Sequence, residues 1–137
     1  MLNIWKNEDS AEMSDLDKLI YQSHLIGTEE SLVLWGGGNT SIKTFEKDFF
    51  GVSQRVLRIK GSGSDLKSVE AKDFPAINLD KVLPLLDRKH MSDEAMVDFL
   101  DHCLMESSAP RPSIETLLHA FLPFKSVVHS HADAILS

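Results

Sequence analysis

The stretch RVLRIKGSGSDL, residues 55–66, decides the fold, because it carries an apolar run straight into a loop of small residues. Its bulky apolar side chains predict a strand over residues 55–60. Residues 41–44 also look like a strand, and the polar neighbours of Gly51 favour pairing of the two segments as a hairpin. We expect the loop of residues 61–66 to lead into a short helix.

Helical patterns lie on both sides of this hairpin. Apolar residues recur at intervals of three and four in four segments, and each segment starts at a polar residue. We expect a helix capped by Asp15 that ends at Gly27, further helices that begin at Asn78, Ser92 and Ser113, and a final strand over residues 126–131. The helix from Asn78 runs to Arg88, with Pro84 tolerated near its first turn. Strands interleaved with helices predict an α/β or α+β layered fold.

Length and composition predict one domain with a single core. The chain has 137 residues, 42% of them hydrophobic and 26% charged, as in an ordinary globular domain. Cys103 has no partner cysteine in the chain, which favours a reducing, cytoplasmic setting. Residues 132–137 look like the first turn of an unfinished helix, so we expect residues 1–137 to be the amino-terminal fragment of a domain.

Charge and hydropathy exclude two classes of partner. Fourteen Lys and Arg against 21 Asp and Glu leave a net charge of -7, with no basic run that would neutralise successive phosphates of a duplex. The amino terminus lacks the apolar core of a signal peptide, and no apolar stretch approaches the ~20 residues needed to cross a bilayer. We therefore expect neither a nucleic acid nor a membrane as partner.

The segment His129-Ser130-His131 is a candidate metal site, because alternate residues of an extended strand place their side chains on the same face. A chain with six histidines contains such a pair by chance in about one case in four, and two hydrogen-bonded polar groups at a strand end are the alternative. A catalytic zinc site needs a third protein ligand. The remaining histidines do not identify it: His24, His90, His102 and His119.

Glu115 and Ser113 stand at the predicted start of a helix. With Ser113 as the N-cap, the Glu115 carboxylate lies in the first turn, where it either interacts with the helix dipole or serves as a base beside a metal. The Ser113 hydroxyl is likewise either a cap or a phosphate ligand. Distance to the metal decides between these roles, and sequence does not measure it.

Two glycine-rich loops, residues 36–41 and 61–66, favour a phosphate site. Their backbone N–H groups, with neutral side chains such as Asn39 and Ser62, would surround an anion without any cation. Neither loop contains the Gly-Lys-Ser/Thr of a P-loop, and the second lacks the third glycine of the dinucleotide fingerprint. Plain structural turns are the alternative for each loop.

Four short motifs follow one another along the chain. They are Gly37-Gly38-Asn39-Thr40-Ser41, Lys60-Gly61-Ser62-Gly63-Ser64-Asp65-Leu66, Arg111-Pro112-Ser113-Ile114-Glu115-Thr116 and His129-Ser130-His131. In this order they resemble the amino-terminal motif series of the class II aldolase/adducin family. Within that family the motif sequences are most similar to those of the aldolase portion of bifunctional rhamnulose-1-phosphate aldolase/alcohol dehydrogenase proteins. The similarity extends from about Trp35 to the last residue.

The resemblance implies a three-layer α/β/α class II aldolase/adducin-like fold around a largely antiparallel sheet, truncated here at the carboxyl end. It also implies a cyclic homotetramer of the full-length protein, with active sites near subunit boundaries. The family's third zinc histidine and its remaining strands and helices are expected beyond Ser137. A dehydrogenase domain after that point is left open.

The resemblance also assigns roles to single residues. His129 and His131 would bind Zn²⁺, and Glu115 would be the catalytic acid/base. The substrate phosphate would be held by Asn39, Ser62, Gly63 and Ser113. Ile114 departs from the second serine that the sugar-phosphate aldolases have at this point, which affects one phosphate hydrogen bond or the choice of substrate.

These roles describe a zinc-dependent aldolase, a carbon–carbon lyase whose small-molecule partner is a sugar phosphate. It would cleave a ketose 1-phosphate such as rhamnulose 1-phosphate into dihydroxyacetone phosphate and an aldehyde. The alternatives are a sugar-phosphate epimerase or dehydratase of the same fold, and a non-catalytic adducin-like interaction module. A fragment that is inactive by itself is a further alternative.

Overall fold

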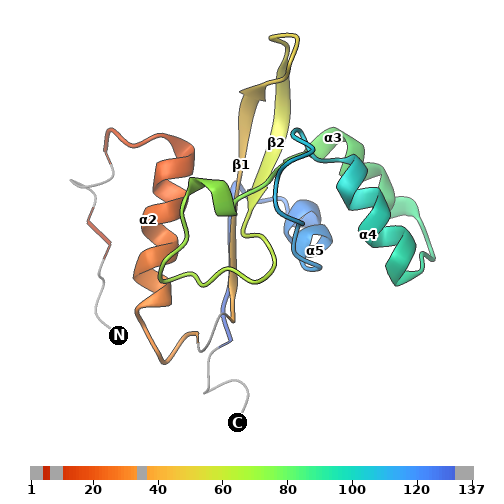
Figure 1. Cartoon of the computed structure of the whole chain (residues 1–137). Helices are drawn as coiled ribbons and strands as arrows, with labels where there is room; N and C mark the ends of the chain where they lie inside the picture. Colours follow the sequence, from red (N-terminus) through yellow and green to blue (C-terminus); the bar gives the residue numbers. More distant parts are fainter. Residues whose placement is uncertain (1–4, 7–10, 34–36, 132–137) are drawn as a thin grey trace.

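The computed structural model describes residues 5–6, 11–33 and 37–131, which form three layers (Figure 1). An antiparallel sheet with the strand order β3-β2-β1-β4 lies in the middle. Its strands are β1 (Asn39–Lys47), β2 (Ser53–Ile59), β3 (Ala76–Asn78) and β4 (Ser126–His129). Helix α2 (Asp15–Gly27) covers one face, and α3 (Leu79–Val82), α4 (Asp93–His102) and α5 (Thr116–Phe121) lie on the other. The expected α/β/α arrangement around an antiparallel sheet is confirmed.

The sheet is buried on both faces because neighbouring residues of a strand point to opposite sides. Leu57 and Ile59 of β2 join the apolar cluster beneath α3, α4 and α5. On the other face, Ile42 of β1 packs with Leu19 of α2 in a second cluster. The two faces therefore have separate apolar cores, where the composition alone suggested one.

The predicted hairpin is confirmed, and both of its strands are longer than expected. Strands β1 and β2 pair in antiparallel register from Ser41 opposite Ile59 to Lys47 opposite Ser53. The Asp48 carboxylate closes the turn, because its Oδ1 accepts from the backbone N–H groups of Phe50 and Val52, each at 2.9 Å. These local bonds explain why the pairing extends to the tip of the hairpin.

The prediction of one continuous helix over residues 78–88 is wrong, because the segment divides into three elements. Asn78 ends β3, which was not predicted, α3 follows, and a 3₁₀-helix spans Leu83–Asp87. Pro84 lies at the start of that 3₁₀-helix, where its missing N–H costs least. Proline therefore ends the α-helix after a single turn.

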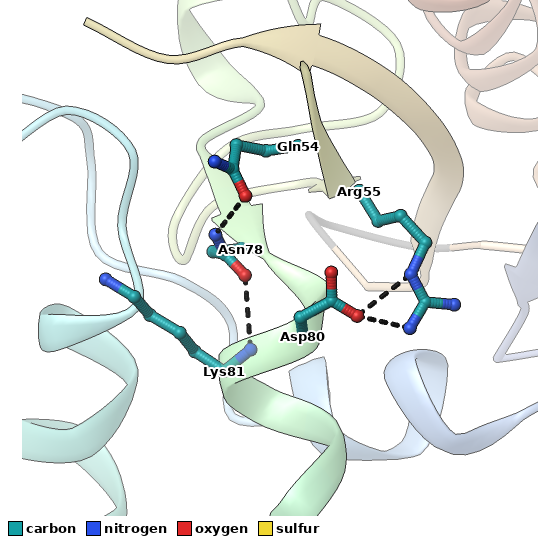
Figure 2. Close-up of polar contacts among 5 residues, drawn as sticks. All are labelled: Gln54, Arg55, Asn78, Asp80 and Lys81. Carbon is teal, nitrogen blue, oxygen red and sulfur yellow. Dashed lines mark hydrogen bonds and ion pairs between the residues drawn. The ribbon is translucent and has the colours of Figure 1, made fainter. Parts of the chain in front are cut away.

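Asn78 joins this helix start to the sheet (Figure 2). Its side-chain oxygen accepts from the backbone N–H of Lys81 at 3.1 Å, and its Nδ2 donates to Gln54 of β2 at 3.3 Å. Beside it, Arg55 of β2 forms an ion pair with Asp80 of α3. A single buried amide thus caps α3 and holds it against β2.

Three other boundaries differ from the prediction. Ser14, not Asp15, caps α2, because its hydroxyl accepts from Asp17 N at 3.2 Å. The loop after β2 leads through turns into a 3₁₀-helix, Ala71–Asp73, which is the only short helix before β3 among the described residues. Strand β4 ends at His129, two residues earlier than expected. The helical turn predicted for residues 132–137 lies outside the described residues.

Within the described ranges, no helix combines the length and the apolar character that a membrane span requires.

Candidate metal centre

Three side chains with metal-binding atoms meet between the sheet and α5. One ligand atom each from Glu115, His119 and His129 lies within 4.8 Å of the others. His129 comes from the end of β4, where it pairs with Asn39 of β1. Glu115 and His119 come from the start and the body of α5, and a spacing of four residues puts them on one side of that helix.

The start of α5 differs from the prediction, and as a result the Glu115 side chain takes no part in capping the helix. The N-cap is Glu115 rather than Ser113, and it makes no side-chain capping bond. The Ser113 hydroxyl accepts from Glu115 N at 3.2 Å, and the Ser113 carbonyl accepts from Thr116 N at 3.0 Å, so residues 113–116 form a turn before the helix. The Glu115 carboxylate therefore points to the histidines instead of the helix N-terminus, with Oε1 3.2 Å from His129 Nδ1.

His131 lies beside this group although it follows the end of the strand. Its ring centroid is 5.0 Å from that of His129, and its Nε2 is 4.0 Å from Glu115 Oε1. The side chain of His131 is 45% exposed, against 31% for His129 and 25% for Glu115. The structure thus brings together all three residues assigned to metal and proton transfer, on a site that is open to solvent at His131.

His119 is the third histidine near this site. The sequence offered four histidines as a third metal ligand and did not distinguish among them. Its ring is fully buried, and Nδ1 lies 2.7 Å from the Ser41 hydroxyl of β1. Burial lowers the pKa of His119 to about 4, against the opposing effect of the Glu115 charge, so the ring is neutral near pH 7. Neutral imidazole is the form that binds a metal. Burial, the contact with Ser41 and the proximity of Glu115 and His129 distinguish His119 from the histidines at 24, 90 and 102, and all three are tertiary features.

Two buried nitrogens of this group lack a hydrogen-bond partner in the described part of the chain. They are His119 Nε2 and His129 Nδ1. Glu115 Oε1 is close to His129 Nδ1, but the alignment is not that of a hydrogen bond. An unpaired buried polar atom costs about 1–3 kcal/mol, and a cation among these atoms would pair both nitrogens and the carboxylate. Two imidazoles with a carboxylate suit zinc, and other divalent transition metals also accept this donor set.

Three of the four residues assigned to phosphate binding, Ser62, Gly63 and Ser113, come from two segments that lie side by side. Gly61 forms an isolated β-bridge with Pro112, and Ser62 N donates to Arg111 O at 3.2 Å, which brings the loop of residues 61–66 next to Ser113. Gly63 is exposed in this loop, with a φ of 85° and open space where a Cβ would stand. The Ser62 backbone N–H is used within the protein, so its hydroxyl is the group left to face a ligand.

Asn39 lies apart from that loop, next to the histidines. It is buried, pairs with His129 across β1 and β4, and its Oδ1 has no hydrogen-bond partner among the described residues. Ser113 is also largely buried, and its hydroxyl is engaged by Glu115 N. Of the four predicted phosphate residues, Ser113 thus contacts Glu115 directly, Asn39 lies beside His129, and Ser62 and Gly63 are exposed in the neighbouring loop.

Lys60 belongs to this site and was not predicted to do so. It is buried at the end of β2, where its ammonium group donates to Ser64 O at 2.7 Å and to Gly61 O at 3.4 Å. Burial lowers its pKa, and the charge of Glu115 acts in the opposite direction. Its position between an apolar strand and a glycine-rich loop is the sequence feature from which its place in the site could have been predicted. Lys60 thus supplies positive charge beneath the loop and near the Glu115 carboxylate.

A family model, a curated relative and a solved structure are similar to this chain. The family model of the Class II Aldolase and Adducin N-terminal domain matches residues 17–137. The uncharacterized oxidoreductase YuxG of Bacillus subtilis (strain 168) is 52% identical over 136 residues, which make up 98% of this chain and 20% of YuxG. A solved N-terminal class II aldolase domain of a conserved protein from Thermoplasma acidophilum matches with a TM-score of 0.93 and 49% identity. That match covers 99% of this chain and 62% of the solved chain, so the chain is shorter than both relatives.

Proposed function

The chain belongs to the family of class II aldolase and adducin N-terminal domains, and from that premise we propose that it is the metal-binding domain of a zinc-dependent aldolase. The family and the fold support a metal-dependent, aldolase-like role in general. The proposed reaction is the cleavage of a ketose 1-phosphate, such as rhamnulose 1-phosphate, into dihydroxyacetone phosphate and an aldehyde. The observation that carries the proposal is the Glu115 carboxylate 3.2 Å from His129, in a group whose buried nitrogens are unpaired.

The metal would be held by His129 and His131, with the Glu115 carboxylate beside them. Such an ion, when bound, polarises a ketose carbonyl oxygen and stabilises negative charge that develops there. The contribution of the chain is to fix these ligands on the end of β4, next to the start of α5. The half-exposed ring of His131 leaves room on the solvent side for a substrate.

Glu115 is the residue suited to move the proton. It makes no capping bond, its side chain is three-quarters buried, and Oε1 faces both imidazoles, at 3.2 Å from His129 and 4.0 Å from His131. The buried ammonium group of Lys60 interacts electrostatically with the same carboxylate. In the proposed reaction Glu115 would accept a proton from a substrate hydroxyl as the carbon–carbon bond breaks.

The phosphate of the substrate would lie between the loop of residues 61–66 and the turn at Ser113. Gly63 presents backbone without a side chain there, and Ser62 presents its hydroxyl. Ser113 and Asn39 complete the proposed set from the buried side. Lys60 ties down the loop through the carbonyls of Gly61 and Ser64, which favours orientation of the intervening groups toward an anion.

The remaining proposals concern the whole protein. YuxG is about five times as long as the matched segment and is called an oxidoreductase. An aldolase domain joined to a dehydrogenase would agree with that name and with the bifunctional proteins that the motifs resemble. We extend the proposal to a cytoplasmic homotetramer with sites near subunit boundaries.

Product analysis of the zinc-loaded chain tests this function. The chain is incubated with rhamnulose 1-phosphate, and dihydroxyacetone phosphate is measured by its enzymatic reduction with NADH. Its appearance, abolished by Glu115→Gln and retained in the remote variant His102→Gln, supports the aldolase. Conversion of the sugar phosphate without this product would replace the aldolase with an epimerase or dehydratase. A folded chain that binds no metal and converts nothing would contradict the proposal.

A further inference from the structure

Lys60 carries a buried charge that forms no ion pair within the described part of the chain. The residue is 4% exposed, and the ion pairs of the described residues do not include it. Lysine is almost never fully buried unless its charge is paired. We propose that an anionic ligand balances this charge: Lys60 is the buried positive charge of an anion site on the loop of residues 61–66, and it favours a phosphate group without touching it. The inference rests on the proposed function, in which this loop holds the substrate phosphate.

The first argument is the orientation of the loop peptides. The ammonium group of Lys60 donates to Ser64 O at 2.7 Å and to Gly61 O at 3.4 Å. In a planar trans peptide the carbonyl and the N–H that follows it point in opposite directions. The N–H of Ser62 therefore points away from Lys60, and it donates outside the loop, to the segment before α5, at 3.2 Å. By the same geometry, the N–H of Asp65 is directed away from Lys60, toward the outer side of the loop.

The second argument is the set of N–H groups that the loop leaves available. Those of Gly63, Ser64 and Asp65 donate to no acceptor among the residues that the structure describes. Gly63 has a φ of 85°, and no atom lies within 4 Å of the place where its Cβ would stand, so the outer side of the loop is open. Successive N–H groups in a turn of this kind form a concave site for an anion. The loop thus offers donors on its outer side while its carbonyls face Lys60.

The third argument is the balance of charge around the loop. Glu115, Asp65 and Asp73 all act electrostatically on Lys60, and their negative charges oppose the binding of a phosphate dianion. The nearby ammonium group of Lys67 is exposed, so water and salt screen it. Lys60 is enclosed by protein, where the lower dielectric constant strengthens its attraction for an anion. The sequence suggested an anion site without any cation, and the structure supplies a cation from the residue before the loop.

NMR titration of the unaltered chain with inorganic phosphate locates the anion. Amide ¹H–¹⁵N spectra of the ¹⁵N-labelled chain are recorded without metal at increasing phosphate, with sodium chloride at matched ionic strength as the control. We expect the amide resonances of Gly63, Ser64 and Asp65 to shift in a saturable way, while that of Gly51 at the remote hairpin turn stays in place. Amides of residues 63–65 that do not respond to phosphate, or that respond equally to chloride, would overturn the inference.

Two lysine variants test the role of the buried charge. Lys60→Met replaces the ammonium group with an uncharged side chain of similar length, and Lys67→Met removes an exposed ammonium group nearby as the matched control. Calorimetry should show phosphate binding weakened about 10-fold or more in Lys60→Met and less than about 2-fold in Lys67→Met. Thermal unfolding shows whether each variant is folded, and phosphate should raise the midpoint of Lys67→Met more than that of Lys60→Met. A folded Lys60→Met chain with wild-type phosphate affinity would overturn the inference.

The aldolase assay separates this inference from the proposed function. In an active zinc-loaded chain, Lys60→Met is expected to raise the KM for rhamnulose 1-phosphate about 10-fold with a smaller effect on kcat, because the charge acts on the phosphate and not on the reacting atoms. Phosphate binding that requires Lys60, in a wild-type chain that releases no dihydroxyacetone phosphate, would support the anion site and contradict the aldolase. Release of that product by Lys60→Met with an unchanged KM would do the reverse.

Discussion

Gly27→Ala is the substitution for which sequence and structure make opposite predictions. Gly27 is the last residue of α2, and alanine is favoured over glycine in a helix by about 1 kcal/mol, so helix propensity alone predicts a more stable protein. In the structure a Cβ at this position would lie 2.3 Å from Lys67 N and 2.6 Å from the carbonyl carbon of Leu66. These are backbone atoms, and they have no rotamer by which to move away.

The expected cost follows from that overlap. Carbon atoms in contact lie about 3.5–4.0 Å apart, so α2 or the segment after the glycine loop must move by about 1 Å. Overpacking of this kind costs about 1–3 kcal/mol and occasionally more. Because the overlap is with backbone, we expect the upper part of that range after the gain in helix propensity is subtracted. Such a loss lowers the midpoint of thermal unfolding by about 5–10 °C.

Circular dichroism of thermal and urea unfolding measures this change. The matched control is Gly51→Ala, where φ is 79° but nothing lies within 4 Å of the added Cβ. Gly51→Ala should lose only the folding free energy that a left-handed backbone conformation costs a residue with a Cβ, about 1–2 kcal/mol. Gly27→Ala should therefore be the more destabilised of the two. A Gly27→Ala protein at least as stable as the wild type would refute the described packing of α2 against residues 66–67.

Three further predictions concern catalysis, a cap and pH. Glu115→Gln is expected to lower the rate of dihydroxyacetone phosphate release about 10²–10⁴-fold without lowering the unfolding midpoint, and a smaller effect on the rate would exclude proton transfer by Glu115. Asn78→Ala should cost about 1–2 kcal/mol in urea unfolding, since it removes the cap of α3 and the bond to β2, and an unchanged midpoint would contradict both. The Thr44 hydroxyl and then the Lys125 charge lower the pKa of Asp15, so this stabilisation is complete above the unfolded-state pKa and is lost as pH falls through the folded one. Thr44→Val should thus be less stable than wild type at pH 7, with the gap closing below about pH 4, and a gap that persists in acid would count against the linkage.

Local pattern was sufficient for much of the fold. The β-favouring residues of segment 55–60 and the polar residues around Gly51 predicted the β1–β2 hairpin, because its pairing and its turn are formed by residues near in sequence. Serine and apolar spacing likewise predicted α4, which begins after Ser92 as expected. Strand β3 was missed because it has three residues, Ala76–Asn78, and its pairing with β2 comes from residues far apart in the chain.

The candidate site divides in the same way. Sequence by itself determined which residue types are available and, through the order of four motifs, the family to which they belong. Only the tertiary structure decided that Glu115 turns away from the helix N-terminus, that buried Lys60 lies beneath the glycine loop, and that His119 stands against Ser41. The physical reason is that these relations depend on distances across the sheet and on exclusion of water. Ser41 and His119 are 78 residues apart in the chain, and only the packing of α5 on β1 makes them neighbours.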